Sequence, residues 1–328
     1  MTKIFIDGEA GTTGLRIHDR LAGREDLEIL HIPDEVRKDP AARQQFLNDA
    51  DIAFLCLPDA ASREAVELLE SDTTVLIDTS TAHRTADGWT YGFPEVNGLR
   101  ADIASAKRIA NPGCHASGFV SLVAPLVSAG VLKPSAALSA TSLTGYSGGG
   151  KKMIAQYEEA ATLVEGTGVD GAASSAVIPA DTLLQAPRMY GLTQVHKHLP
   201  EMVKVCGLAS APVFLPIVAP YYAGMEVVIG LSAADLVDGK GIDDVRHAYA
   251  EAYRDGLVRF VESADEGGFL SAAAFSGRDD MQITVVGNEE RIVLVSRFDN
   301  LGKGASGAAI QNMNIVLGAP ESTGLNVG

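Results

Sequence analysis

The chain is poor in cysteine and in positive charge. Its 328 residues include three cysteines and 26 Lys and Arg residues, against 42 Asp and Glu residues. Cys56, Cys114 and Cys206 are too few and too scattered for a disulfide framework or a zinc knuckle, and no metal site is expected. The formal net charge of -16 argues against nonspecific binding to nucleic acid or anionic membranes, because both use clustered Lys and Arg. An anionic small molecule would need a local cationic site.

Signals for secretion or membrane insertion are also missing. The N-terminal residues enter a strand pattern at once and lack the apolar region of a signal peptide. Of the two long uncharged stretches, residues 116–132 are slightly short and contain Pro125, and residues 205–225 contain three prolines. Prolines suit a buried strand with turns better than a spanning helix. The sequence therefore predicts a soluble cytoplasmic protein.

The first third of the sequence alternates short apolar runs with helical patterns. Strands are expected at residues 4–7, 27–31, 52–57 and 75–78, and helices at residues 12–21, 40–48 and 60–69. This alternation predicts a parallel sheet with helices on both faces, which binds ligands beyond the carboxyl ends of its strands. One such end falls at Leu57–Pro58, so Pro58 is a candidate cofactor contact.

The pattern changes after Cys114. Strands are expected at residues 137–143, 213–218, 225–231, 282–286 and 292–297, and helices at residues 116–132, 243–255 and 305–317. The last helix is expected to pack back onto the first domain. The predicted fold class is therefore α/β, with a Rossmann-type parallel-sheet dinucleotide domain (residues 1–113 and 300–328) and an α+β catalytic domain (residues 114–299).

A glycine-rich turn links the first strand to the first helix. It contains Gly8, Gly11 and Gly14, with Thr12 and Thr13 between the last two. Glycines there let the backbone approach a pyrophosphate, whose charge is then met by the amides at the helix N-terminus. The spacing G-x-x-G-x-x-G is less specific than G-x-G-x-x-G, and a turn without a ligand is the alternative.

The segment after the second strand bears on the choice of cofactor. It carries Arg37 and Lys38, which favour a 2′-phosphate and hence NADP over NAD. Asp34 and Glu35 lie beside them, so a solvated charged loop is the alternative.

Cys114 and a pair of histidines are the candidate catalytic groups. Cys114 stands just ahead of an expected helix, whose positive end favours the thiolate, the nucleophile of covalent catalysis. His196 and His198 precede a helix expected from Pro200, and in an extended segment both would project the same way. Near Cys114, one of them could act as base and acid. A buried thiol and structural histidines are the alternatives.

Together these segments resemble the N-acetyl-gamma-glutamyl-phosphate reductase family, most closely its shorter type. The resemblance covers nearly the whole chain and rests on residues 7–14, 111–114, 145–151, 196–201, 299–307 and 311–314. It implies a catalytic domain like that of aspartate-semialdehyde dehydrogenase, and a homodimer or homotetramer. The implied activity is NADPH-dependent reduction of an acyl phosphate to a semialdehyde and phosphate through a cysteine thioester, in arginine biosynthesis.

The same resemblance assigns roles to single residues. It makes Cys114 the nucleophile and His196 and His198 the acid–base region, without choosing between the histidines. Gly11 and Gly14 match the pyrophosphate turn, and Asn312 matches the region near the nicotinamide. The expected substrate contacts are Ser80, Arg84, Asn111, Ser147 and Lys151. His115 is a departure, since tyrosine is common there in the longer type.

Three alternatives remain open. A related reductase acting on aspartyl or aminoadipyl phosphate would use the same residues, because nothing in the sequence alone reads the length of the acyl chain. A thiol hydrolase would leave the glycine turn without a purpose. A noncatalytic NADP-sensing protein is disfavoured because the chain has both Cys114 and the histidine pair.

Overall fold

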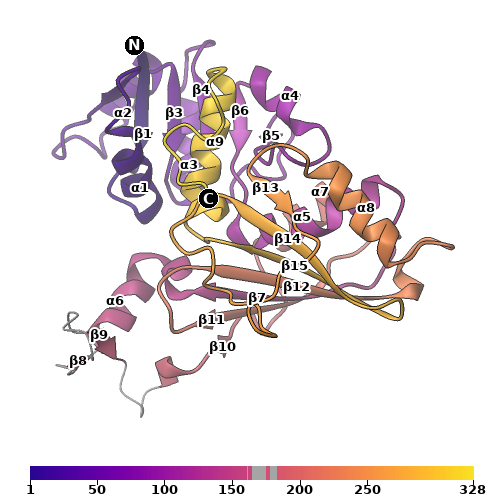
Figure 1. Cartoon of the computed structure of the whole chain (residues 1–328). Helices are drawn as coiled ribbons and strands as arrows, with labels where there is room; N and C mark the ends of the chain where they lie inside the picture. The colour runs from indigo at the N-terminus through magenta and orange to yellow at the C-terminus, as the bar shows by residue number, and fades with distance from the viewer. Residues whose placement is uncertain (161, 165–174, 178–182) are drawn as a thin grey trace.

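The chain forms two sheets, each with its own helices, in a computed structural model that describes residues 1–160, 162–164, 175–177 and 183–328 (Figure 1). The first sheet is parallel, with strand order β2-β1-β3-β4-β6-β5. Its strands are β1 (Thr2–Asp7), β2 (Leu27–Leu30), β3 (Ile52–Leu55), β4 (Val75–Asp78), β5 (Thr90–Tyr91) and β6 (Arg108–Ala110).

Helices cover both faces of this sheet because its strands are apolar on both sides. On one face lie α1 (Thr12–Leu21), α4 (Leu99–Ser105) and α9 (Gly307–Val316), which share a core with Ile4 and Ile77. On the other face lie α2 (Pro40–Asp49) and α3 (Asp59–Leu68), which pack against Phe5 and Leu76. The C-terminal helix α9 thus returns to the first sheet, and Figure 1 shows it in yellow beside β4 and β6.

The second sheet is mixed, with strand order β10-β11-β7-β12-β15-β14-β13. Its strands are β7 (Ser139–Gly145), β10 (Arg188–Met189), β11 (Val213–Ala219), β12 (Met225–Ser232), β13 (Val258–Phe260), β14 (Met281–Gly287) and β15 (Arg291–Phe298). A separate antiparallel pair, β8 (Thr162–Val164) and β9 (Ser175–Val177), follows α6 (Gly150–Ala160). Short helical turns lie at Tyr146–Gly149, Leu183–Gln185, Ala233–Asp235 and Gly302–Ser306.

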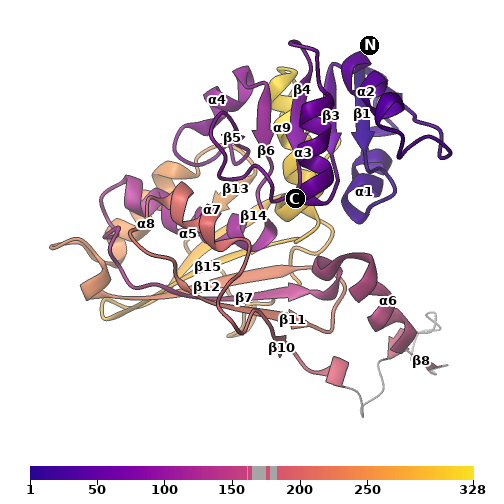
Figure 2. The same cartoon turned by 180° about the vertical axis from the view of Figure 1, so that it is seen from behind.

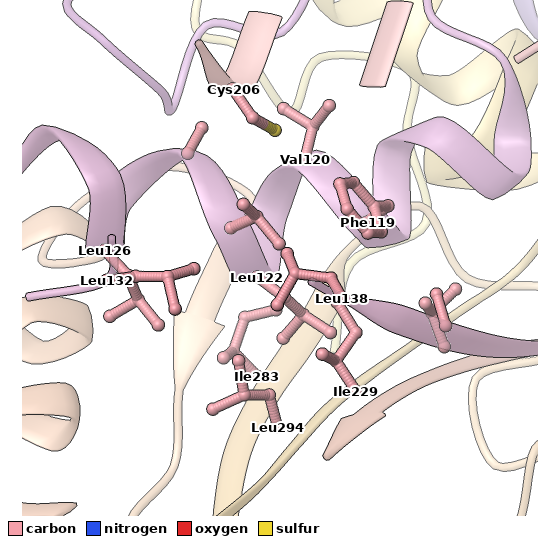
Figure 3. Close-up of a cluster of buried hydrophobic side chains, with 14 of the residues drawn as sticks. Phe119, Val120, Leu122, Leu126, Leu132, Leu138, Cys206, Ile229, Ile283 and Leu294 are labelled. Carbon is pink, nitrogen blue, oxygen red and sulfur yellow. The ribbon is translucent and has the colours of Figure 1, made fainter. Parts of the chain in front are cut away.

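One face of the second sheet carries the largest core of the molecule. Three helices supply it, α5 (Cys114–Ser128), α7 (Leu199–Cys206) and α8 (Ile242–Ala252), and Figure 2 shows them on the side that faces the first domain. Figure 3 shows Phe119, Val120 and Leu122 of α5 among Leu138, Ile229, Ile283 and Leu294 from the sheet side. The continuous apolar stretch that begins at Ala116 is therefore an internal helix. Among the described residues, no helix has the length and hydropathy needed to cross a membrane.

A buried ion pair joins the segment before α9 to the first domain. The Lys303 ammonium lies 2.8 Å from both carboxylate oxygens of Glu95, and Gln311 donates a third contact to the same carboxylate at 2.8 Å. Burial alone would raise the pKa of Glu95, but Lys303 lowers it below its usual value. Since a buried charge that loses its partner is strongly destabilising, this network fixes how the chain leaves the second sheet and returns to the first.

Candidate active site

A cavity opens where the carboxyl ends of the first sheet meet the N-terminus of α5. It is lined mainly by residues from six segments that are far apart in the sequence: Thr12 and Thr13, Thr79 and Arg84, Asn111–His115, Ser147–Gly150, His196–His198, and a last segment that supplies Asn300, Leu301, Gly304 and Ala305. The structure therefore brings the predicted nucleophile and both predicted histidines into one cavity with the start of the first helix.

Cys114 is the first residue of α5 and is half-buried. The preceding residue, Gly113, allows close packing around the thiol: a Cβ there would lie 2.3 Å from His198 Nε2 and 2.4 Å from Arg84 Nη1. Gly304 faces Cys114 in the same way, since its Cβ would lie 3.0 Å from that of Cys114. Two glycines thus let a histidine, an arginine and the opposite loop approach the cysteine.

Burial outweighs the helix end in setting the acidity of the thiol. The pKa of Cys114 is raised from its usual value, mainly because burial disfavours the thiolate. The charges of Arg84 and Lys197 lower this pKa, and the charge of Glu201 raises it. The helix N-terminus therefore does not offset the effect of burial on the thiol, and the site needs a base that takes the thiol proton.

Both histidines are neutral near pH 7. Burial, and then the charge of Arg84, lower the pKa of His198 well below its usual value. Burial and Lys197 lower the pKa of His196. The two rings lie 4.7 Å apart between centroids, and His196 Nδ1 accepts the His198 backbone N–H at 3.2 Å. His198 Nδ1 is buried and has no hydrogen-bond partner among the described residues. A neutral imidazole with a free nitrogen can accept a proton.

His115 supports the two rings and has no free nitrogen. Its Nδ1 lies 2.6 Å from Ser142 Oγ and its Nε2 lies 2.6 Å from the Tyr190 hydroxyl. Burial lowers its pKa to about 3, so it stays neutral. Its ring centroid lies 5.8 Å from that of His196 and 5.6 Å from that of His198. His115, the position at which this sequence departs from the longer type of the family, therefore packs against both candidate histidines.

Arg84 lies in the cavity, but the protein itself uses all of its nitrogens. Nε donates to the Asn111 carbonyl at 3.0 Å, Nη2 to the Thr79 carbonyl at 3.1 Å and Nη1 to Glu201 at 3.0 Å. Three of the five N–H donors of Arg84 are thus used within the protein, and one on each of Nη1 and Nη2 is left. Arg84 therefore has a structural role next to Cys114, and its expected contact with the substrate stays a prediction.

Glu201, the partner of Arg84, was not among the predicted site residues. Its carboxylate is buried and also accepts the Tyr91 hydroxyl at 3.1 Å and the Gly113 backbone N–H at 3.2 Å. It lies 3.9 Å from His198 Nε2. In the sequence, an acid in the first turn of a helix after Pro200 is the ordinary pattern of a helix start. The signal that could have found it is its place three residues after His198.

Lys197 is the second site residue that the sequence analysis left unassigned. It lies between the two histidines, lines the cavity and is exposed. Within the described part of the chain it has no carboxylate partner in an ion pair, unlike Arg84. Lys197 is therefore the cation that remains available to an anion in the cavity.

The other predicted substrate residues lie in three places. Asn111 and Ser147 line the cavity. The Ser80 hydroxyl donates to Asp78 at 2.8 Å, and Ser80 lines the adjoining groove with Pro58 instead. Lys151 donates to the Ala10 carbonyl and lines the pocket of the glycine turn, not that of Cys114. Lys151 lies in this pocket because α6, the helix that carries it, begins close to the glycine turn.

Asn312 is fully buried and acts on the cavity only through a neighbour. Its Nδ2 donates to the Gly92 carbonyl at 3.0 Å and to Asn111 Oδ1 at 3.2 Å. Asn111 in turn donates to the Ala305 carbonyl at 3.0 Å. The side chain of Asn312 therefore positions Asn111, and its expected place near a nicotinamide stays a prediction.

The glycine turn frames a second, larger pocket. Gly8 has a φ of 89°, and a Cβ there would lie 2.4 Å from the Cys56 carbonyl oxygen. Gly11 is the N-cap of α1 and provides no side-chain cap, so the first amides of the helix are left for a ligand. Gly14 packs against the turn itself, since its Cβ would lie 2.6 Å from the Gly8 carbonyl oxygen. These residues fit a pyrophosphate.

Basic side chains also line this second pocket. Arg37, Lys38 and Pro58 are among its lining residues. Arg37 lies 3.3 Å from Asp34 and both side chains are exposed, a pairing that costs little to break. Arg43 also lines this pocket, but it is buried and held by Asp7 at 2.9 Å and Glu64 at 2.8 Å. Arg37 and Lys38 are thus available there, together with Lys151, which also lines this pocket.

Comparisons with known proteins agree with this architecture. The profile described as "Semialdehyde dehydrogenase, NAD binding domain" matches residues 9–106, and "Semialdehyde dehydrogenase, dimerisation domain" matches residues 114–300. The N-acetyl-gamma-glutamyl-phosphate reductase 2 of Nostoc sp. is 43% identical over 334 residues, covering 98% of this chain and 99% of the relative. The N-acetyl-gamma-glutamyl-phosphate reductase of Sinorhizobium medicae is 42% identical over 325 residues, covering 97% and 99%.

Solved structures extend the comparison to the fold. Aspartate-semialdehyde dehydrogenase from Francisella tularensis superposes with a TM-score of 0.69 at 15% identity, covering 97% of this chain and all of that one (100%). A probable aspartate-semialdehyde dehydrogenase from Pseudomonas aeruginosa gives 0.68 at 15% identity, covering 96% and 98%. The predicted Rossmann-type domain with a catalytic domain like that of aspartate-semialdehyde dehydrogenase is confirmed, and so is the predicted family.

The buried charges around Cys114 predict how the reactivity of its thiol depends on pH. We expect the rate at which iodoacetamide alkylates Cys114 to rise through a midpoint above the usual thiol pKa of about 8.5. Glu201→Gln removes a negative charge that raises the pKa of Cys114, so the midpoint should fall by about one pH unit. Peptide mapping by mass spectrometry at each pH isolates the Cys114 rate from those of the other cysteines.

Tyr91→Phe is the matched control. It removes a hydrogen bond to Glu201 but keeps the carboxylate charge, so its alkylation midpoint should stay close to that of the unaltered protein. A midpoint that rises in Glu201→Gln, or that falls equally in both variants, would contradict the electrostatic role of Glu201.

Proposed function

The chain belongs to the N-acetyl-gamma-glutamyl-phosphate reductase family, and on that premise we propose that it reduces N-acetyl-gamma-glutamyl phosphate to N-acetyl-glutamate semialdehyde with NADPH, through a thioester on Cys114. The observation that carries the proposal is that one cavity holds Cys114, both histidines and the first residues of α1, which begin the dinucleotide site. A cytoplasmic location stays a prediction.

Cys114 forms the covalent bond. Its sulfur attacks the acyl carbon, the bond from that carbon to the phosphate oxygen breaks, and phosphate leaves with the electron pair, which gives the thioester. The thiol proton must leave first, because burial raises the pKa of Cys114. His198 is the stronger candidate to take it, since it is neutral, buried and has an unpaired Nδ1.

The second half of the reaction regenerates the thiol group. When bound, NADPH supplies the hydride that reduces the thioester carbonyl. The oxyanion formed then collapses to the aldehyde as the C–S bond breaks, and the protonated histidine returns its proton to the leaving sulfur, which restores the Cys114 thiol. His196 helps to position His198, because His196 Nδ1 accepts a hydrogen bond from the backbone N–H of His198.

Recognition of the phosphate rests on Lys197. The substrate is a polyanion, and the protein is strongly acidic, so a local cation is required. Lys197 lines both the Cys114 cavity and the groove that leads to the glycine turn. Arg84 keeps its charge beside Cys114 but donates its hydrogen bonds to the protein. Lys197 therefore fits a contact with the leaving phosphate.

We include a homodimer in the proposal, formed through the open face of the second sheet. On that face the half-buried apolar side chains Leu143, Leu215, Ile217 and Val228 lie on the adjacent strands β7, β11 and β12. On the same strands, Phe214, Val227 and Ile229 belong to the core on the opposite face. The match to a "dimerisation domain" over residues 114–300 supports a second copy as the group that covers this face.

The proposed reaction predicts which substitution abolishes it. Cys114→Ser should lower turnover of N-acetyl-gamma-glutamyl phosphate by about three orders of magnitude or more, since it removes the covalent step. The dissociation constant for NADPH should stay within about twofold, because Cys114 is not among the residues of the glycine-turn pocket. NADPH oxidation and NADPH fluorescence measure the two quantities.

Assays with aspartyl and aminoadipyl phosphates separate the substrate alternatives. Faster steady oxidation with either of them than with N-acetyl-gamma-glutamyl phosphate would assign the chain to the related reductase. NADPH binding without turnover of any of the three would favour the sensing protein.

Cofactor choice is predicted to depend on Arg37 and Lys38. Replacing both with Ala should raise the dissociation constant for NADPH more than tenfold and leave that for NADH nearly unchanged, since each charge-assisted contact contributes about 1.5–3 kcal/mol. Lys240→Ala with Arg246→Ala, on the other domain, is the matched control. An equal loss for both cofactors would show that Arg37 and Lys38 do not read a 2′-phosphate.

The proposed dimer is tested by placing a charge on the open sheet face. Leu215→Glu should convert the dimer to a monomer, since a carboxylate buried between two apolar faces is strongly unfavourable. Light scattering coupled to gel filtration measures the mass. Arg246→Glu, on the helix that packs against the opposite face, should remain a dimer; an unchanged mass for Leu215→Glu would place the interface elsewhere.

A further inference from the structure

A cluster of possible metal ligands lies at the glycine turn, at the edge of the dinucleotide pocket and away from Cys114. Glu9 belongs to the turn between β1 and α1, His18 lies on α1 and His31 directly follows β2. One ligand atom from each of the three lies within 4.8 Å of the other two. No sequence motif joins them, because the parallel pairing of β1 with β2 is what brings them together.

The distances are close to those of a coordination site. Glu9 Oε1 lies 3.5 Å from His18 Nε2, and Glu9 Oε2 lies 3.8 Å from His31 Nδ1. A tetrahedral zinc ion with bonds of about 2.0–2.1 Å keeps its ligand atoms about 3.3 Å apart. The two pairs that include Glu9 therefore need to close by a few tenths of an ångström, and the two histidines, whose ligand atoms lie within 4.8 Å of each other, need a larger side-chain adjustment. Glu9 and His18 are half-buried, and His31 is exposed and able to adjust.

The surroundings also suit a cation. In the part of the chain that the structure describes, the Glu9 carboxylate has no Lys or Arg partner. His18 Nδ1, the nitrogen that does not face Glu9, lies 3.6 Å from the Asp19 carboxylate. That distance is too long for a hydrogen bond, so the exposed Asp19 adds its negative charge to the site and does not orient the ring. The net charge of -16 adds a favourable field.

We propose that Glu9, His18 and His31 form a binding site for a divalent metal ion of the zinc type, held by two imidazoles and one carboxylate. Imidazole ligands select zinc, nickel or copper over magnesium and calcium, which prefer oxygen. Three protein ligands leave a fourth position for water. A bound ion would tie α1 to the end of β2, and Glu9 would carry its effect to the dinucleotide pocket, which it also lines.

The test measures zinc binding directly, in the full chain with Cys114→Ser so that the Cys114 thiol does not ligate the ion. Isothermal titration with Zn²⁺ should show one ion per chain, with no competition from Mg²⁺. His18→Asn and His31→Asn should each weaken binding by at least about tenfold, the lower range seen when even a supporting group of a metal site is lost. Asp19→Asn should have a smaller effect in the same direction.

His247→Asn is the matched control, because His247 is an exposed histidine on α8, in the other domain. It should leave the zinc affinity unchanged. The proposal is overturned if the Cys114→Ser chain binds no zinc at millimolar concentration. It is equally overturned if His18→Asn and His31→Asn bind zinc as the parent does, or if His247→Asn weakens binding as much as they do.

Discussion

The buried carboxylate of Glu201 is the interaction on which the site depends. It accepts hydrogen bonds from Arg84, from Tyr91 and from the backbone of Gly113. The first two belong to the dinucleotide-binding half, the third precedes the candidate nucleophile, and Glu201 itself lies on α7. Burying a carboxylate and a guanidinium costs several kcal/mol for each ion unless their hydrogen bonds are satisfied. The satisfied network therefore tolerates one relative placement of the two halves.

A second buried ion pair, Lys303 with Glu95, also restricts how the two halves are placed relative to each other. Lys303 and Glu95 are both fully buried, and Glu95 also receives Gln311 from α9. The loop that carries Lys303 and the start of α5, which follows Gly113, both supply residues that line the cavity. The cavity is thus formed before any ligand binds, since each wall is anchored by a charge that cannot lose its partner cheaply.

Much of the fold could be predicted because long periodic segments carry their own signal. The helix expected at residues 12–21 is found at Thr12–Leu21, and the strand expected at residues 75–78 at Val75–Asp78. The short elements β5, β6 and β13 and the helix α4 were missed, because two to seven residues give too little periodicity. α5 begins two residues earlier than expected because no side-chain cap marks its start.

Charged residues of the site were the hardest to predict, because their roles depend on partners far away in the sequence. Arg84 and Glu201 are 117 positions apart, and only their contact shows that the arginine is already paired. Their effects on Cys114 also oppose each other, since Arg84 lowers and Glu201 raises the pKa of the thiol. The pair therefore contributes geometry more than net charge. Lys197, which lies between the histidines without a carboxylate partner among the described residues, is left to set the field that an incoming anion meets.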